Sequence, residues 1–466
     1  MPYQSFNFLH RWLGYIIFLQ SALHTIGWSI IEIRLYQPQP STGLNWIRQS
    51  YMIWGLVAMI LLTFLVILSS PWGIRLTGYE AFRKLHYVLA MVYIGACWGH
   101  WEQLKVFLIP SLIVWLLDRA VRLVRTGLLH YGFLASGHMG VRPATTNVTV
   151  FADSTNGDVI RIDFQHPHDP WSVGQHFYLT FPESSIWQSH PFTPLSRPVT
   201  NVSAQQHSYI FRAKSGETSK VAEMCVRRSV STSDAQKPED GLLGGAKLSV
   251  ILTGPYGEET TRNLAHDANV LCIAGGTGIT YVLPVLLDIA SRPQATDRRL
   301  SLVWAVRRVQ DIEWIGEEIN ILRSKCEEAR IGIHIYVTRT AQGSKETPLA
   351  TTVADELKDQ SQHESQPGIN LARAASSSES SALSVHGISK GESEQDHIQA
   401  RPNLQALVEE FVAWTVRGKT SVFASGPGEM ISDLRKTIAT VNNGKRVWRG
   451  EERYDVRLTC DNRLEW

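Results

Sequence analysis

The sequence predicts a chain of several domains: a transmembrane helical bundle, an antiparallel β-barrel or sandwich, and an α/β nucleotide-binding domain. Three observations indicate this order. Long uncharged stretches fall within the first 117 residues, short strand-like segments follow from about residue 140, and strands alternate with helices around a glycine-rich turn after residue 266. The domain boundaries that we expect are 1–130, 140–260 and 266–466.

Composition alone conceals the membrane part. A charged fraction of 19% and a mean hydropathy of −0.09 are ordinary for a soluble protein, because the polar remainder dilutes the apolar start. A length of 466 residues suggests two to four domains, and a net charge of +2 gives no indication of nucleic-acid binding. The five cysteines have no CxxC or metal-ligand spacing, which predicts reduced thiols.

Four stretches are predicted to cross a membrane: residues 12–31, 51–70, 85–101 and a shorter 106–117. The fourth is interrupted by Asp118 and Arg119. Basic residues cluster after the second and fourth stretches, so the positive-inside rule places both termini in the cytosol.

Histidines recur at matched spacing in two of these predicted helices. His10 lies just before the first stretch and His24 lies within it, fourteen residues further along the chain. The same interval separates His86 and His100 in the third. Fourteen residues make nearly four helical turns, so each pair faces one way, at two levels about 21 Å apart. On two parallel helices this spacing predicts two stacked bis-histidine sites, as for two haems in a bilayer about 30 Å thick.

The alternative is that these histidines are simply packed or hydrogen-bonded, as most helix histidines are. An ionisable side chain inside a membrane is costly and usually serves a function, and the repeated spacing also favours ligation. With the termini in the cytosol, His10 and His86 form the inner site. His24 and His100 then form the outer one.

The second region contains strand-like segments at 147–152, 159–164 and 176–181. Within it, His190, Pro191, Phe192 and Thr193 form a short segment that precedes glycine turns at Gly216 and at 254–257. Taken alone, the segment reads as an ordinary loop. Its order before the glycine turns favours a flavin site, where turn amides approach phosphates and Thr193 hydrogen-bonds the flavin ring edge.

The third region opens with a buried-strand run at 270–274, a glycine turn and an apolar helix at 282–290. A strand at 300–306 and a helix at 313–326 continue the alternation of a parallel sheet. The turn is predicted to hold a pyrophosphate at the helix N-terminus. Its residues are Gly275, Gly276, Thr277, Gly278, Ile279 and Thr280.

Two arginines, Arg307 and Arg308, end the 300–306 strand where a ligand crevice is expected. Guanidinium groups suit a 2′-phosphate, which favours NADPH over NADH. The alternative is a pair of solvated surface arginines.

Residues 342–402 are rich in Ser, Glu, Gln and His without apolar periodicity, which predicts a disordered insert in a surface loop. A strand is predicted at 421–424. It leads into Ser425, Gly426 and Pro427, a turn suited to the nicotinamide side of NADPH. The chain ends in Trp466, an aromatic residue suited to covering a flavin ring.

Together these segments resemble the fungal ferric reductases of the flavocytochrome b superfamily, which also contains the superoxide-forming NADPH oxidases. The motifs occur in the family's order over nearly all of the chain outside 342–402. The resemblance implies a ferredoxin-reductase-like pair of domains and three kinds of cofactor: FAD, NADPH and two haems b. It implies haem ligation by the four histidines, FAD binding by His190, Pro191, Phe192, Thr193, Gly216 and Trp466, and NADPH binding by the 275–280 turn, Arg307, Arg308 and the 425–427 turn.

The implied activity is reduction of Fe(III) chelates or Cu(II) across the membrane with electrons from cytosolic NADPH, in support of iron uptake. The expected partners are the lipid bilayer and the metal acceptor, with no nucleic acid. The expected location is the plasma membrane.

Two alternatives stay open. One is a superoxide-forming NADPH oxidase, although oxidases usually space the second histidine pair one residue closer and end in Phe. The other is an inactive membrane scaffold, because relatives have additional helices before the one that bears the first histidine pair. Here that helix begins near Met1, so we expect an N-terminal truncation. Ser425 stands where relatives often carry Cys, which bears on the efficiency of hydride transfer.

Overall fold

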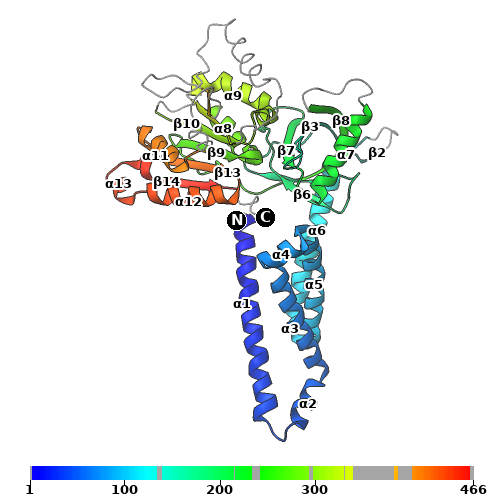
Figure 1. The fold of residues 1–466 in the computed structure, drawn as a ribbon. Helices are drawn as coiled ribbons and strands as arrows, with labels where there is room; N and C mark the ends of the chain where they lie inside the picture. Colours follow the sequence, from blue (N-terminus) through cyan, green and yellow to red (C-terminus); the bar gives the residue numbers. More distant parts are fainter. Residues whose placement is uncertain are drawn as a thin grey trace. The chain divides into compact units, whose positions relative to one another are not determined.

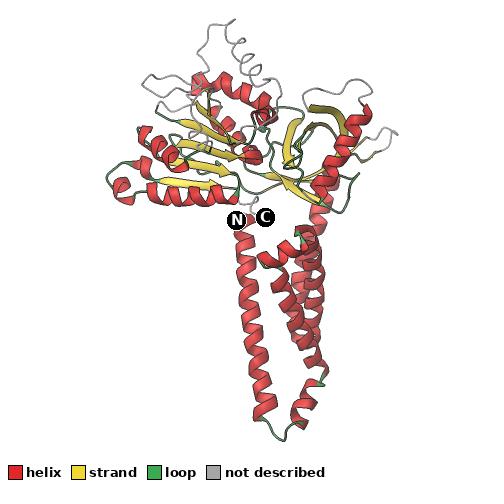
Figure 2. Ribbon diagram, viewed as in Figure 1, coloured by secondary structure: helices red, strands yellow, loops and turns green. Residues whose placement is uncertain are grey.

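The computed structural model describes residues 3–133, 139–214, 216–232, 242–292, 297–329, 331–338, 383–386 and 401–461. The chain divides into two compact units, Met1–Leu128 and Leu129–Glu465. The first is helical (Figure 1), and the second contains an antiparallel sheet and a parallel sheet with helices (Figure 2). The predicted fold class is thereby confirmed.

Long helices dominate the first unit. Uncharged apolar sequence forms most of them, and short helices connect them because proline and serine interrupt the apolar runs. Ser70 caps one short helix by accepting a hydrogen bond from the backbone N–H of Gly73 at 3.1 Å. The long helices are α1 (Tyr3–Ile30), α3 (Ser50–Leu68), α5 (Tyr79–His100) and α6 (Lys105–Leu129), and the short ones are α2 (Ser41–Ile47) and α4 (Pro71–Thr77).

Among the described residues, two helical segments are long and apolar enough to cross a membrane, Phe6–Leu35 and Ser50–Leu68. The helices α5 and α6 fall at the third and fourth predicted spans, and both carry charged residues. Helix α6 continues through Asp118 and Arg119 to Leu129, beyond the predicted fourth span. Asp118 pairs with Arg122 one turn later, with 2.9 Å between Oδ2 and Nε, so these charges pair along the helix and do not end it.

The first sheet of the second unit is antiparallel, in the order β6-β5-β8-β3-β4-β7. The long strand β8 pairs with β3 along its first part and with β5 along its last part, so it joins the two halves of the sheet. Helix α7 (Glu217–Thr232) packs against β8. The strands are β3 (Ala144–Phe151), β4 (Val159–His166), β5 (His176–Thr180), β6 (Ser189–Phe192), β7 (Gln205–Arg212) and β8 (Leu242–Tyr256).

A separate two-stranded sheet, β1 (Tyr131–Phe133) with β2 (Met139–Val141), precedes this antiparallel sheet.

The second sheet is parallel, in the order β12-β11-β10-β9-β13-β14. Strand β9 is a nearly continuous buried apolar run, as expected for a strand covered on both faces. The strands are β9 (Asn269–Gly275), β10 (Leu300–Val306), β11 (Ile331–Val337), β12 (Leu383–His386), β13 (Thr420–Ser425) and β14 (Val456–Cys460).

Helices cover both faces of the parallel sheet. Val282 of α8 and Ile319 of α9 belong to the core on one face, with Trp304 and Trp314. Val408 of α11 and other apolar side chains of α11 and α12 form the core on the opposite face. The helices are α8 (Ile279–Ala290), α9 (Gly316–Ala329), α11 (Leu404–Trp414) and α12 (Gly428–Val441).

The expected insert at 342–402 lies largely outside the described residues. Four residues within it, however, form β12, which pairs in parallel with β11 from Leu383 opposite Ile333 to His386 opposite Tyr336. These four residues differ from the expectation of a loop without regular structure, and they add a strand to one edge of the sheet.

Candidate functional site

The two turns predicted to bind a nucleotide meet at one point of the parallel sheet. Strand β9 ends at Gly275, and its neighbour β13 ends at Ser425. Strand β10 pairs with the other side of β9, so the strand order reverses between β9 and β13. Ligands of open α/β sheets bind at the carboxyl ends of the strands at such a switch point. The fold therefore brings the 275–280 and 425–427 segments together where a dinucleotide site is expected.

Glycines in the first turn have different surroundings. A Cβ built on Gly275 would lie 2.7 Å from Cδ of Pro427, and one on Gly278 would lie 2.2 Å from the carbonyl oxygen of Ser425. By contrast, Gly276 has a φ of +55°, and no atom of the residues that the structure describes lies within 4 Å of its Cβ position. Gly278 thus permits close packing, while the backbone at Gly276 is open to a ligand. These are the roles that glycines play in dinucleotide-binding turns.

The other residues of the two turns hold this arrangement in place. The turn is a 3-10 helix, Gly276–Gly278, that leads directly into α8, where Ile279 and Thr280 are buried. Thr280 Oγ1 donates to the carbonyl oxygen of Thr277 at 3.1 Å. Ser425 is buried, Gly426 lies against Gly275, and Pro427 stands just before α12.

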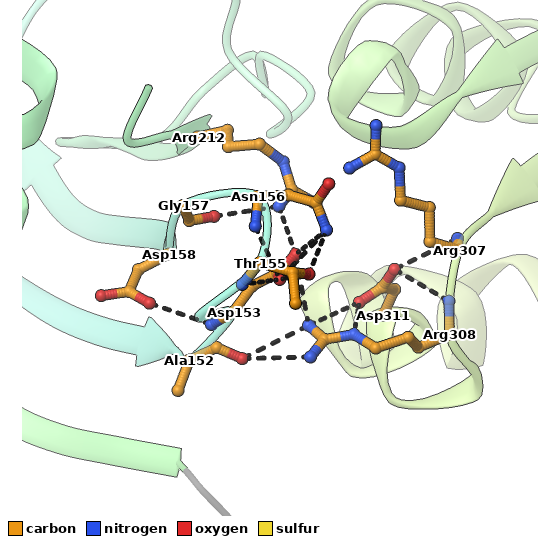
Figure 3. Close-up of polar contacts among 10 residues, drawn as sticks. All are labelled: Ala152, Asp153, Thr155, Asn156, Gly157, Asp158, Arg212, Arg307, Arg308 and Asp311. Atoms are coloured by element: carbon orange, nitrogen blue, oxygen red, sulfur yellow. Dashed lines mark hydrogen bonds and ion pairs between the residues drawn. The ribbon is translucent and has the colours of Figure 1, made fainter. Parts of the chain in front are cut away.

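The two arginines after β10 differ in their contacts. Figure 3 shows the side chain of Arg307 pointing away from Asp311, and it is exposed and makes no hydrogen bond or ion pair within the part of the chain that the structure describes. The guanidinium of Arg308 is instead engaged, with Nη2 3.1 Å from Oδ1 of Asp311 and 3.3 Å from the carbonyl oxygen of Ala152. The sequence does not distinguish the two arginines. In the structure the guanidinium of Arg308 is engaged, and that of Arg307 is exposed.

Asp153 lies at the centre of the contacts in Figure 3. Its carboxylate pairs with Arg212 at 2.6 Å and faces Arg308 at 3.7 Å. Burial alone would raise the pKa of Asp153, but hydrogen bonds from Arg212, Thr155 and Asn156 and the charge of Arg308 hold it well below its ordinary value. Sequence reasoning missed this carboxylate, because nothing near it in the chain distinguishes it from a turn aspartate.

The predicted flavin residues lie mainly on one edge strand. His190, Pro191 and Phe192 belong to β6, which pairs with β5 and ends the strand order of its sheet, and Thr193 follows. A proline is tolerated at such an edge, and the outer side of an edge strand presents backbone hydrogen-bonding groups to a ligand. Phe192 packs on Phe211, with 5.1 Å between ring centroids.

Two further predicted flavin residues lie elsewhere. Gly216, with a φ of +64°, stands at the N-terminal end of α7. Trp466 lies outside the described residues.

The four histidines of the first unit come together two by two. The ring centroids of His10 and His86 are 6.0 Å apart, and those of His24 and His100 are 6.3 Å apart. Two imidazoles that ligate one metal ion from opposite sides, with metal–nitrogen bonds of about 2.0 Å, have centroids roughly 6 Å apart. Both separations fit bis-histidine ligation of haem iron.

Helix α3 orients the two histidines of α5. Nδ1 of His100 lies 2.8 Å from the carbonyl oxygen of Tyr51, which only accepts, so Nδ1–H donates and Nε2 is left for a metal. Nδ1 of His86 lies 3.3 Å from Oγ of Ser69. The ring of His100 also lies against Gly55, where a Cβ would be 2.5 Å from Nδ1. Sequence reasoning missed these partners, since their spacing along the chain carries no signal.

Another group of histidines, which the sequence did not single out, lies in the antiparallel sheet. Nε2 of His168 is 2.6 Å from Nε2 of His207, and the ring of His166 lies 5.5 Å from that of His168. Burial, followed by the charges of His130 and His168, lowers the pKa of His166 to about 4. Burial and the charges of His168 and His166 lower the pKa of His207 to about 2. Among the described residues, no group of three or more His, Cys, Asp or Glu is arranged to hold a metal ion.

Comparison with known families finds three matches in series. Residues 1–97 match the ferric reductase like transmembrane component, and residues 145–260 match an FAD-binding domain. Residues 267–439 match the ferric reductase NAD binding domain. The three matches together cover most of the chain.

Curated fungal proteins are similar along nearly the same range. Ferric reductase transmembrane component 3 of Saccharomyces cerevisiae is 25% identical over 95% of this chain and 54% of its own length. Ferric/cupric reductase transmembrane component 2 of the same yeast is 27% identical over the same shares. Its namesake in Schizosaccharomyces pombe is 24% identical over 76% of this chain and 64% of its own length. The chain spans about half the length of the Saccharomyces relatives.

Among solved structures, a ferredoxin-NADP+ reductase from Plasmodium falciparum covers 72% of this chain and all of its own, at 12% identity and a TM-score of 0.35. That likeness adds nothing to what the sequence relatives indicate.

Proposed function

Since the chain belongs to the ferric reductase family, we propose that it is an NADPH-dependent ferric-chelate reductase of a membrane. When bound, FAD takes a hydride from NADPH and haem iron takes single electrons, so that the electron pair of one NADPH reduces Fe(III) ions one at a time. The observation that carries the proposal is the pairing of His10 with His86 and of His24 with His100.

The nucleotide side of the proposal rests on the switch point of the parallel sheet. The open backbone at Gly276 and the first turn of α8 offer N–H groups to a pyrophosphate. Arg307 supplies an unengaged guanidinium for the 2′-phosphate that distinguishes NADPH from NADH. The Ser425 to Pro427 turn, packed on Gly275 and Gly278, bounds the nicotinamide side.

The flavin side rests on the open edge of β6. His190 to Thr193 line that edge, and Gly216 at the start of α7 supplies a turn in which the backbone can approach a phosphate. Trp466 is proposed to cover the flavin ring.

Each histidine pair is proposed to hold one haem b. The hydrogen bond from His100 to the carbonyl oxygen of Tyr51 fixes the tautomer that leaves Nε2 as the ligand. The positive-inside distribution of basic residues supports His10 and His86 as the inner pair and a cytosolic second unit.

Fe(III) chelates are the proposed acceptor, with Cu(II) as a second one, because two of the similar proteins are described as ferric/cupric reductases. The proposed location is the plasma membrane, in support of iron uptake.

The test is a reduced-minus-oxidised spectrum of the purified membrane protein with haem quantified per chain, followed by NADPH-dependent Fe(III) reduction. We expect two low-spin haems per chain, and His24→Ala should lose one and retain the other. His266→Ala, which changes an exposed histidine far along the chain from the helices, should keep both.

Three results would contradict the proposal. Unchanged haem content in His24→Ala removes the two-level assignment. Superoxide formation that exceeds Fe(III) reduction indicates an NADPH oxidase. A folded protein that binds no haem indicates a membrane scaffold.

A further inference from the structure

Arg161 of β4 is a buried cation whose contacts reach across to the α/β part of the second unit. Its guanidinium donates to both carboxylate oxygens of Glu318, at 2.8 and 2.9 Å, and to the carbonyl oxygen of Trp314 at 2.9 Å. Arg161 and Glu318 are 7% and 8% exposed. A bidentate ion pair that is shielded from water fixes both the distance and the angle between the two elements that contribute its residues.

The charge on Arg161 is well supported. Burial alone would lower the pKa of Arg161, but hydrogen bonds to Glu318 and to Asp163 of its own strand raise it above the ordinary value. The guanidinium of Arg161 therefore stays charged.

A second set of contacts joins the same two parts. Arg308, which follows β10, reaches the carbonyl oxygen of Ala152 and faces Asp153, which follows β3 (Figure 3). Asp153 in turn pairs with Arg212 of β7, whose guanidinium lies 5.4 Å from the ring centroid of Trp314. Trp314 is thus held twice, through its backbone by Arg161 and through its ring by Arg212.

Trp314 links these contacts between the two sheets to the 275–280 turn. Its ring lies 6.3 Å from that of Trp304, and both side chains are almost completely buried. Nε1 of Trp304 donates a hydrogen bond to the carbonyl oxygen of Gly276 at 3.0 Å. A continuous path of contacts therefore runs from Arg161 through two packed indoles to the turn at which NADPH is proposed to bind.

We propose that Arg161 and Trp304 are positioning residues for hydride transfer. The Arg161–Glu318 pair fixes the position of the parallel sheet relative to the antiparallel sheet. The packed Trp314 and Trp304 side chains then hold the carbonyl group of Gly276 in place relative to that ion pair. The inference rests on the proposed function, because it takes the 275–280 turn as the NADPH site.

The test uses the full chain with two conservative variants. Trp304→Phe keeps an aromatic ring and removes the N–H donor to Gly276. Arg161→Lys keeps the positive charge and removes the bidentate ion pair with Glu318. Hydrogen–deuterium exchange of peptides covering 269–290 reports the turn, and stopped-flow reduction of the flavin by NADPH reports hydride transfer. We expect roughly 10-fold faster exchange in the turn and roughly 10-fold slower flavin reduction, with FAD content unchanged.

Matched controls come from the antiparallel sheet and its neighbours. Arg228→Lys alters an arginine that pairs with Glu183 and donates to the carbonyl oxygen of Lys247, all outside the α/β part. Trp171→Phe alters another buried indole. Both should leave exchange in 269–290 as in the wild type, and dithionite-driven haem reduction should be unchanged in every variant.

The outcomes separate the two proposals. Wild-type exchange and wild-type flavin reduction in Trp304→Phe overturn the positioning role, as does an equal change in the controls. If Arg161→Lys loses FAD through unfolding, Trp304→Phe decides. If the wild type shows no flavin reduction by NADPH, the proposed function fails, and the exchange measurement still decides whether these residues hold the turn.

Discussion

Gly55 illustrates how a single residue without chemical function determines the orientation of a proposed haem ligand. The ring of His100 occupies the space where a side chain at position 55 would be, and this close approach lets Nδ1 reach the carbonyl oxygen of Tyr51 on the same helix. Helices otherwise keep side chains of this size at a greater distance. The orientation of His100 therefore depends on the lack of a side chain at position 55 of α3.

Gly55→Ala is expected to displace His100 and weaken the outer haem site. A Cβ 2.5 Å from Nδ1 forces the ring to move, and loss of such an orienting contact costs about 10- to 100-fold in metal affinity. Haem content should fall from two to about one per chain, measured by the pyridine haemochrome spectrum. Gly127→Ala on α6, where no described atom lies within 4 Å of the Cβ position, should keep both haems. Full haem content in Gly55→Ala would contradict this assignment.

At the scale of the element, the unit formed by β9, the glycine turn and α8 shows strong agreement between pattern and structure. An apolar run of strand length followed by glycines and an apolar helix dictates a buried parallel strand, a tight turn and a covering helix. What the pattern does not contain is the partner of the turn. Gly278 packs on Ser425, which arrives from β13, so one element supplies the turn and another limits its position.

Gly278→Ala is expected to impair NADPH binding and spare the flavin. A Cβ there would lie 2.2 Å from a backbone oxygen that cannot swing aside, so the turn must shift at a cost of about 1–3 kcal/mol, or roughly 5- to 150-fold in affinity. Steady-state kinetics should show a KM for NADPH raised by about 10-fold, while FAD per chain stays constant. Gly316→Ala, at an open position in α9, provides the comparison and should leave the KM unchanged.

At the scale of the whole molecule, the second unit combines two sheets that are joined by buried charges. Its apolar cores are formed by residues of the two sheets and their helices, and the arginine contacts cross from one sheet to the other. The same unit also buries histidines. Its stability should therefore depend on pH through His166 and His207, whose folded-state pKa values are about 4 and about 2.

The second unit is expected to lose stability as the pH falls below about 6.5. The unfolded chain takes up protons at these histidines and the folded chain does not, so the free energy of unfolding decreases by up to about 1.4 kcal/mol per pH unit and per histidine. For His166 the loss continues down to about pH 4. The Tm followed by flavin release should be lower at pH 5 than at pH 7.

His166→Phe should reduce the slope of unfolding free energy against pH by the contribution of one proton, because the variant keeps an aromatic ring and removes the titrating group. His266→Ala, at an exposed position, should leave the slope as it is. A Tm that is constant from pH 7 to pH 5 would show that the buried histidines are protonated in the folded state.

The sequence by itself determined the order of the helical, antiparallel and parallel parts, the matched spacing of the four histidines, and the two turns proposed to bind a nucleotide. These features are local: a hydrophobic period sets the element, glycine sets the turn, and a fourteen-residue interval on a helix sets a common face. For the same reason the strands β4, β9 and β10 lie close to their predicted limits. Local pattern did not indicate how far α6 extends, because pairing between Asp118 and Arg122 lets the helix continue through charges to Leu129.

Only the tertiary structure decided which candidates act together. It brought the 275–280 turn to Ser425, engaged Arg308 with Asp311 and left Arg307 exposed. It also placed Tyr51 and Gly55 beside His100, and Trp304 beside Gly276. Each of these outcomes depends on contacts between segments that are distant in the chain. Such contacts follow from the packing of whole elements, so they cannot be predicted from the residues that neighbour each position in the sequence.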